Sequence, residues 1–238
     1  MDWHLWSLLG LGLLLGVRHA LDPDHVAAVS TIVARTPSIW KSTVIGACWG
    51  LGHTTVLLLA GAVVIGFHLT IPPHLEQWFE CAVGVMLVVL GLSLAWSLSQ
   101  EGWHWHRHEH DGRSHTHLHA HRDKPETHHQ HGHGHWLQGG LKPFLVGMLH
   151  GLAGSAGLLL VVLATVESVA VGLLYIAIFG IGSIVGMVAV GLLVSLPLHY
   201  AADWGPLARL SVRGAVSLAT VVIGLWTIHE TGVIGTLF

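Results

Sequence analysis

The stretch HALDPDH, residues 19–25, decides how this chain folds, because it sets ionisable groups directly after a long apolar run. The preceding residues, LLGLGLLLGV at 8–17, would be at home in lipid. Ionisable side chains are costly inside a bilayer and mark functional positions there. Pro23 cannot donate a backbone hydrogen bond and clashes with the preceding turn. The sequence therefore predicts a helix that ends near His19 and restarts near Pro23.

The composition places the whole chain among membrane proteins. Of its 238 residues, 52% are hydrophobic and 10% are charged, whereas soluble domains carry about 25% charged residues. The formal net charge is -3, and the sequence has no basic stripe of the kind that phosphate binding needs. We therefore expect the lipid bilayer as a partner and no nucleic acid.

Six segments are long and apolar enough to cross a bilayer, which takes about 20 residues of helix. The predicted spans are 3–35 (broken near Pro23), 39–67, 75–99, 140–165, 168–199 and 207–234. The predicted fold is therefore an all-α integral membrane protein with six transmembrane helices, the first of them broken.

The positions of lysine and arginine predict the orientation of these spans. Six spans place the connections 35–41, 100–139 and 200–213 on one side, and nearly all the basic residues lie there. Basic loops are retained in the cytoplasm. We therefore predict a multi-pass protein of the cytoplasmic membrane, with both termini outside the cytoplasm and the longest connection inside it.

The two halves of the chain resemble each other at a nearly constant offset. The matched segments are GVRHALDPD (16–24) with GMLHGLAGS (147–155), GLGHTTV (50–56) with GIGSIVG (180–186), and AVGVMLVVLGL (82–92) with AVSLATVVIGL (215–225). Three spans in each half is an odd number, so the halves would insert in opposite orientations, as in transporters built from inverted repeats. Chance similarity among apolar helices is the alternative.

A histidine-rich segment, 100–138, separates the N-terminal three-helix repeat, 1–99, from the C-terminal one, 139–238. It contains thirteen of the 22 histidines: His104, His106, His108, His110, His115, His117, His119, His121, His128, His129, His131, His133 and His135. Alternating histidines are a low-complexity metal-binding pattern, and the polar composition argues against a folded site. We expect a flexible cytoplasmic loop that binds metal with low affinity.

The opening stretch offers ligands for a divalent transition metal. His19, Asp24 and His25 supply two imidazoles and a carboxylate, a set that suits nickel, cobalt or zinc. On one continuous helix, His19 and His25 would point about 240° apart and could not share an ion. The predicted break lets the three side chains converge, as ligands do at the discontinuous helices of transporters.

Three further residues are candidate ligands. His53 and His150 lie near the middle of their predicted spans, at the depth of His19. For His53 the alternative is a hydrogen bond to a neighbouring helix. Asp22 is either a helix cap alone or a cap and a ligand, and Arg18, four residues earlier, is placed to pair with it.

These residues resemble those of the nickel/cobalt transporter family. HALDPDH fits that family's H-x4-D-H pattern, and LLLGVRHALDPDHVAAV and GLGHTTV look like its first two conserved blocks. HGLAGSA is similar to the shorter urease-accessory, NicO-like and UreH-like relatives, which are associated with nickel supply. The resemblance implies that His19, Asp24 and His25 line the metal pathway, together with His53.

The chain also departs from that family. Typical members have eight spans, whereas this chain is predicted to have six, and GLAGSAG at 151–157 replaces an acidic motif of their fourth span. A related superfamily of six-span efflux proteins carries a histidine-rich cytoplasmic loop in the same place. The form DPDH is typical of importers, whereas the loop is typical of exporters.

We expect a secondary transporter that takes up Ni²⁺, with Co²⁺ as a second substrate, through a midplane site of His and Asp ligands. The sequence has neither a G-x-x-x-x-G-K-[ST] loop nor an H-E-x-x-H motif, so neither ATP use nor an intramembrane metalloenzyme is expected. No cofactor is expected besides the transported ion. The alternatives are an efflux protein of the same architecture and a metal-sensing or metal-delivery protein that acts through its loop. A homo-oligomer and a downstream nickel-enzyme maturation system are candidate partners.

Overall fold

The computed structural model is mainly helical. It describes residues 3–35, 38–67, 69, 71–100, 103–110, 113–120, 135–153, 168–203 and 205–236. Its helices are α1 (Trp3–His19), α2 (Pro23–Val33), α3 (Ile39–Gly66), α4 (Pro73–Ser99), α5 (His135–Ala153), α7 (Val169–Asp203), α8 (Pro206–Glu230) and α9 (Val233–Thr236). Its strands are β1 (Trp103–His110) and β2 (Arg113–Ala120).

The predicted break in the first span is confirmed. Helix α1 ends at His19, and α2 begins at Pro23 with Asp22 in the N-cap position. A tight turn joins them, in which the backbone N–H of Asp22 donates to the carbonyl of His19 at 3.0 Å. The proline ring is tolerated because the first helical position has no intrahelical donor to lose.

Four helices within the described ranges are long and apolar enough to cross a membrane: α3, α4, α7 and α8. They correspond to the predicted spans 39–67, 75–99, 168–199 and 207–234. The first predicted span is divided into pieces of 17 and 11 residues, both shorter than the about 20 residues that a typical span takes. The fourth, 140–165, is described only as far as the end of α5, and the rest of GLAGSAG lies outside the described residues. The count of six stays a prediction.

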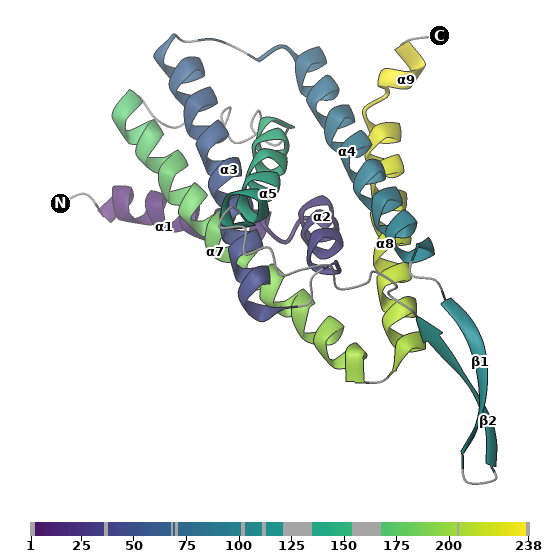
Figure 1. The fold of residues 1–238 in the computed structure, drawn as a ribbon. Coiled ribbons are helices and arrows are strands. Elements are labelled where there is room, and N and C mark those ends of the chain that lie inside the picture. Colours follow the sequence, from purple (N-terminus) through teal and green to yellow (C-terminus); the bar gives the residue numbers. More distant parts are fainter. Residues whose placement is uncertain are drawn as a thin grey trace.

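The helices form two groups with α2 between them (Figure 1). In one group α1 packs along α7, and α3 packs against both α5 and α7; in the other, α4 pairs with α8. The hydroxyl of Thr31 in α2 lies 2.7 Å from that of Thr220 in α8. Nη2 of Arg35, just after α2, donates to Oγ of Ser93 in α4 at 2.6 Å. Helix α2 is thus tied to the α4–α8 pair.

Glycines allow these helices to approach closely. A β-carbon added at Gly16 of α1 would collide with the carbonyl oxygen of Phe179 in α7. A β-carbon at Gly147 of α5 would collide with that of Trp49 in α3. Small residues at helix contacts are typical of membrane bundles, where close van der Waals packing replaces the hydrophobic effect.

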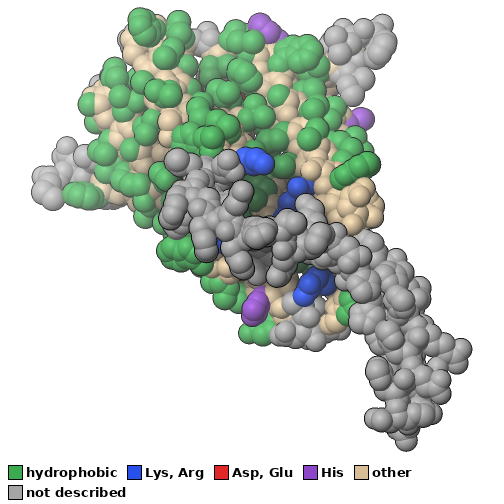
Figure 2. Space-filling model, in the orientation of Figure 1, with side chains coloured by type: hydrophobic (Ala, Val, Ile, Leu, Met, Phe, Trp, Pro, Cys, Tyr) green, Lys and Arg blue, Asp and Glu red, His purple; other side chains and the backbone are tan. Residues whose placement is uncertain are grey.

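The outer surface of the helices is apolar, as expected of a surface that faces lipid. Figure 2 shows hydrophobic side chains over most of one face, with the basic side chains gathered lower on it. Leu14, Trp96, Leu207 and Trp226 are among the large side chains left at least 60% exposed. A soluble domain would rarely leave so many large apolar side chains uncovered.

Part of the histidine-rich segment forms an antiparallel hairpin, β1–β2, which projects from one end of the bundle (Figure 1). The register pairs His104 with His119, and His108 with His115. This differs from the expectation of a flexible loop without a folded site. The sequence offers a physical reason for the strands, because histidine recurs at every second position and a period of two residues is that of a strand. The predicted division of the chain into two three-helix repeats and a cytoplasmic loop stays a prediction.

Candidate metal centre

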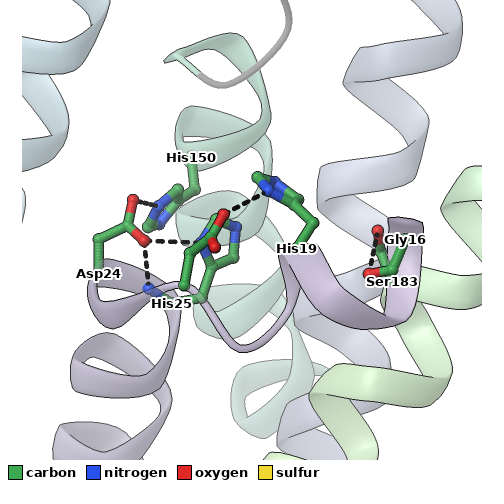
Figure 3. A network of polar contacts seen from close by, with 7 residues as sticks. Gly16, His19, Asp24, His25, His150 and Ser183 are labelled. Atoms are coloured by element: carbon green, nitrogen blue, oxygen red, sulfur yellow. Dashed lines mark hydrogen bonds and ion pairs between the residues drawn. The ribbon is translucent and has the colours of Figure 1, made fainter. Parts of the chain in front are cut away.

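The broken helix gathers the predicted ligands from four helices. His19 ends α1, and Asp24 and His25 lie in the first turn of α2. His53 comes from α3, and His150 comes from the last turn of α5. Figure 3 shows His25 between His150 and Asp24 on one side and His19 on the other. The chain turn at Pro23 is what lets both sides of the break face one point.

Asp24 holds two of the imidazoles. Its Oδ1 lies 3.0 Å from Nδ1 of His25 and accepts the backbone N–H of His25 at 2.8 Å. Its Oδ2 lies 2.8 Å from Nε2 of His150. Since His150 is 126 residues away in the sequence, this carboxylate joins the two halves of the chain.

The four imidazole rings lie next to one another. The ring centroids of His25 and His150 are 3.9 Å apart, and those of His19 and His25 are 4.5 Å apart. The His53 ring lies 5.2 Å from His19 and 5.4 Å from His25. The rings are tilted or edge-on rather than stacked face to face.

Several nitrogens of this cluster are buried without a partner. His25, His53 and His150 are at most 1% exposed. Among the described residues, Nε2 of His25, Nδ1 of His150 and both ring nitrogens of His53 have no hydrogen-bond partner. An unsatisfied buried polar group costs about 1–3 kcal/mol. A bound metal ion would satisfy these lone pairs, which is a physical reason for their burial.

The donor atoms fall into two overlapping groups. In one, donor atoms of His19, His25 and His53 all lie within 4.8 Å of one another; in the other, those of Asp24, His25 and His150 do. Imidazole nitrogen with a little carboxylate oxygen is the donor chemistry of nickel, cobalt and zinc. The structure thus brings together five of the six residues predicted as ligands.

Asp22 belongs to neither group. Its Oδ2 lies 2.8 Å from Nδ1 of His19, and it makes no side-chain cap to α2 although it occupies the N-cap position. A carboxylate that accepts from Nδ1 directs Nε2 of the same ring toward the ion and fixes its tautomer. The contact between Asp22 and His19 therefore favours a role for Asp22 in orienting the His19 ring. In the structure Asp22 pairs with His19 and not with Arg18, which the sequence had suggested as its partner.

Replacing Asp22 by asparagine is expected to weaken Ni²⁺ binding by about 10- to 100-fold without abolishing it, since groups that orient ligand histidines contribute on this scale. Calorimetric titration of Ni²⁺ into the purified full chain measures the affinity. Glu230→Gln, which neutralises an exposed carboxylate at the end of α8, is the control. Unchanged affinity would show that the contact does not orient His19, and complete loss would make Asp22 a ligand itself.

The other sequence candidates lie apart from the cluster or outside the description. Ser183, at the position aligned with His53, donates to the carbonyl of Gly16 at 3.3 Å. The loop histidines from 104 to 119 belong to strands β1 and β2, whereas those from 121 to 133 lie outside the described residues. Low-affinity metal binding by this segment stays a prediction.

Two aromatic residues of the site were missed. Trp49 is fully buried, with its ring 5.6 Å from that of His150 and its Nε1 without a partner among the described residues. Phe179 of α7 packs its ring 5.5 Å from His19. Spacing could have found Trp49, because it precedes His53 by four residues and therefore shares its helix face.

Comparison with known proteins agrees with this chemistry. A model of the NicO family, described as "High-affinity nickel-transport protein", matches residues 5–228. The urease accessory protein UreH of Bacillus sp. (strain TB-90) is 37% identical over 236 residues, which cover 98% of this chain and 96% of that protein. A high-affinity nickel transport protein of Cupriavidus necator is 32% identical over 91 residues, 37% of this chain and 25% of that protein. No solved structure matches significantly. These matches confirm the resemblance that HALDPDH indicated.

Proposed function

This chain belongs to the NicO family of high-affinity nickel-transport proteins, and we propose that it is a secondary transporter that takes up Ni²⁺ across the cytoplasmic membrane, with Co²⁺ as a second substrate. Family membership makes a metal ion the substrate and argues against an enzymatic role. The observation that carries the proposal is the set of buried, unpartnered ring nitrogens at the break between α1 and α2.

The site has the form of an ion-binding site in a transporter. Discontinuous helices near the middle of the membrane supply ligands in many transporter folds. Here His19 follows one half-helix, while Asp24 and His25 open the next. Neutral imidazoles and one carboxylate hold a divalent ion without fully neutralising it, so release stays feasible.

The helix contacts support two inverted repeats. In the alignment of the two halves, Gly16 of the first half corresponds to Gly147 of the second half. Likewise, Trp49 of the first half corresponds to Phe179 of the second half. The close approach of Gly16 to Phe179 therefore corresponds to that of Gly147 to Trp49. Helix α1, the first of the N-terminal half, packs on α7 of the C-terminal half, and α5, the first of the C-terminal half, packs on α3 of the N-terminal half. A pseudo-twofold axis between the halves requires this exchange.

Two further pairs obey the same relation. Gly182 of α7 approaches the backbone of Leu13 in α1, and Gly52 of α3 approaches that of Phe144 in α5. In the third helices, Gly84 lies against Gly224, and Oγ of Ser217 donates to the carbonyl of Gly91 at 2.8 Å. Equivalent residues in equivalent contacts support the proposed inverted repeat over the alternative of chance similarity.

We propose that rocking of one repeat against the other opens the site to each side of the membrane in turn. The sequence has no nucleotide-binding loop, so the driving force is the membrane potential or an ion gradient. A potential of 100 mV contributes about 4.6 kcal/mol to the inward movement of a divalent ion. A negative interior therefore favours uptake.

The proposed topology has six spans, with both termini outside the cytoplasm. Helices α4 and α7 end, and α3 and α8 begin, at the end of the bundle from which the hairpin projects (Figure 1). Lys41 and Arg209 lie in the first turns of α3 and α8, and Arg35 follows α2. The enrichment of basic residues at this end supports the proposal that it faces the cytoplasm.

Uptake of radioactive nickel by cells that express the full chain tests the function. Accumulation above that of cells with an empty vector is expected, and it should disappear in the His25→Ala variant but not in His229→Ala, which changes an exposed histidine at the end of α8. Depletion below the empty vector would instead establish the alternative, an efflux protein of the same architecture.

The histidine-rich segment supports a second alternative, a membrane protein that senses or delivers metal. The name of the UreH relative refers to urease accessory function, and on that basis we propose that imported nickel supplies a nickel-enzyme maturation system. In the transporter account the loop is auxiliary, because no described contact joins it to the metal centre.

Deleting residues 104–134 is expected to leave nickel accumulation in cells close to that of the intact chain, because all five residues of the metal centre remain. The deletion stops before α5, so the helix that carries His150 stays complete. Radioactive nickel uptake, normalised to the amount of protein in the membrane, is the measurement. Loss of uptake with a correctly inserted protein would favour the sensing or delivery role.

A further inference from the structure

We infer that the metal centre is two alternative ion sites that share His25, and that one ion passes between them. The imidazole site consists of His19, His25 and His53; the carboxylate site consists of Asp24, His25 and His150. The inference rests on the proposed transport function and describes how its site works. A single five-ligand site would instead hold the ion at one position.

The two nitrogens of His25 support a division of the centre. Its Nδ1 lies 3.0 Å from Oδ1 of Asp24 and therefore faces the carboxylate site. Its Nε2, on the opposite edge of the ring, is buried without a described partner and is the nitrogen left for the imidazole site. The two nitrogens of one imidazole point away from each other, so they cannot both bind one ion.

The two sites differ in how readily they accept an ion. In the carboxylate site, Asp24 is already hydrogen-bonded to both His25 and His150, so an ion has to replace those contacts. In the imidazole site, both nitrogens of His53 are unpartnered among the described residues. The imidazole site is neutral and selects by donor type, whereas the carboxylate site adds a negative charge that attracts the cation.

Each site has one partly exposed donor. His25, His53 and His150 are essentially fully buried, but the side chain of His19 is 20% exposed and that of Asp24 is 31% exposed. These two residues lie on opposite sides of the break. We therefore expect an ion to enter beside one of them and to leave beside the other, with His25 binding it through one nitrogen in the first site and through the other nitrogen in the second.

The two sites exclude each other. A neutral imidazole has a lone pair on only one of its two nitrogens, so His25 can serve only one of the two sites at a time, and its ring proton lies on the other nitrogen. The metal centre should therefore bind a single high-affinity equivalent, separate from the weaker binding predicted for the histidine-rich segment. Its coordination, however, should depend on which site a variant leaves intact.

Titration of Co²⁺ into the purified full chain, followed by visible absorption, tests the inference, because the ligand-field bands of Co²⁺ report its donors. We expect one high-affinity equivalent in the wild-type protein and one in each of His53→Ala and His150→Ala. Each single variant should bind within about 10-fold of the wild-type affinity, with spectra that differ from each other, because each retains a different site. The variant that carries both His53→Ala and His150→Ala should lose at least 100-fold in Co²⁺ affinity, and so should His25→Ala.

Gel filtration establishes that each variant is folded, and His53→Gln and His150→Gln, which preserve more of the side-chain volume, replace any alanine variant that is not. Equal loss of at least 100-fold in both single variants would overturn the inference in favour of one five-ligand site, while leaving the transport function intact. Two high-affinity equivalents in the wild type, each lost in one of the two single variants, would overturn mutual exclusion. Unchanged binding and uptake in His25→Ala would instead overturn the proposed function itself.

Discussion

Replacing His25 by alanine is expected to abolish nickel uptake and to weaken Ni²⁺ binding by more than about 100-fold. Groups that merely orient metal ligands contribute 10- to 100-fold, and His25 is itself a donor in both described groups. No other described residue can take over its role, since only His25 belongs to both groups. Radioactive uptake in cells and calorimetric titration of the purified chain measure the two effects.

His229→Ala is the matched control for this variant, because it removes an exposed imidazole far along the chain. Gel filtration of both variants separates loss of the site from loss of the fold. Binding by His25→Ala within a few-fold of the wild type would refute the assignment of the centre, whatever happened to uptake.

Replacing Gly16 by leucine is expected to destabilise the helix bundle by about 3 kcal/mol, at the upper end of the cost of overpacking. A β-carbon there collides with the backbone of Phe179, and backbone cannot move aside as a flexible side chain can. The variant should also lose nickel binding, because Gly16 lies three residues before His19 and positions the end of α1. Thermal inactivation of the detergent-solubilised chain measures the stability.

Gly10→Leu provides a control on the same helix, since a β-carbon at Gly10 meets nothing within 4 Å. Gly147→Leu provides the symmetric test, because its contact with Trp49 is the counterpart of the Gly16 contact. The inverted repeat predicts that the leucine variants at Gly16 and Gly147 lose similar amounts of stability, and that the variant at Gly10 changes little in stability. A stable Gly147→Leu variant beside an unstable Gly16→Leu variant would contradict that symmetry.

The break and the three candidate ligands beside it could be predicted from sequence because their cause is local. Pro23 prevents a continuous helix whatever surrounds it, and His19 and His25 can meet only if the helix is interrupted. His53 could be predicted because a lone histidine at the middle of an apolar span is costly and marks function. In each case the signal lies within one helix.

The contacts between helices could not be predicted in the same way. That His150 reaches Asp24 depends on how α5 lies against α2, and that Trp49 packs on His150 depends on how α5 lies against α3. The partner of Asp22 depends on the geometry of a three-residue turn, where His19 competes with Arg18. Hydropathy determines which segments are helices, but it does not determine which faces meet.

The hairpin illustrates a different limit. Its composition is that of a disordered, polar segment, while its alternation has the period of a strand. Composition and periodicity thus predicted opposite outcomes for residues 103–120, and the expectation followed composition. The pairing of β1 with β2 follows periodicity.

An anomalous difference map at the nickel absorption edge, from crystals of the full chain grown with Ni²⁺, tests the central claim most directly. The account predicts a peak at the interruption between α1 and α2, at a bonding distance of about 2 Å from a ring nitrogen of His25. A map with no peak there, and with nickel only on the histidines of the hairpin, would contradict it.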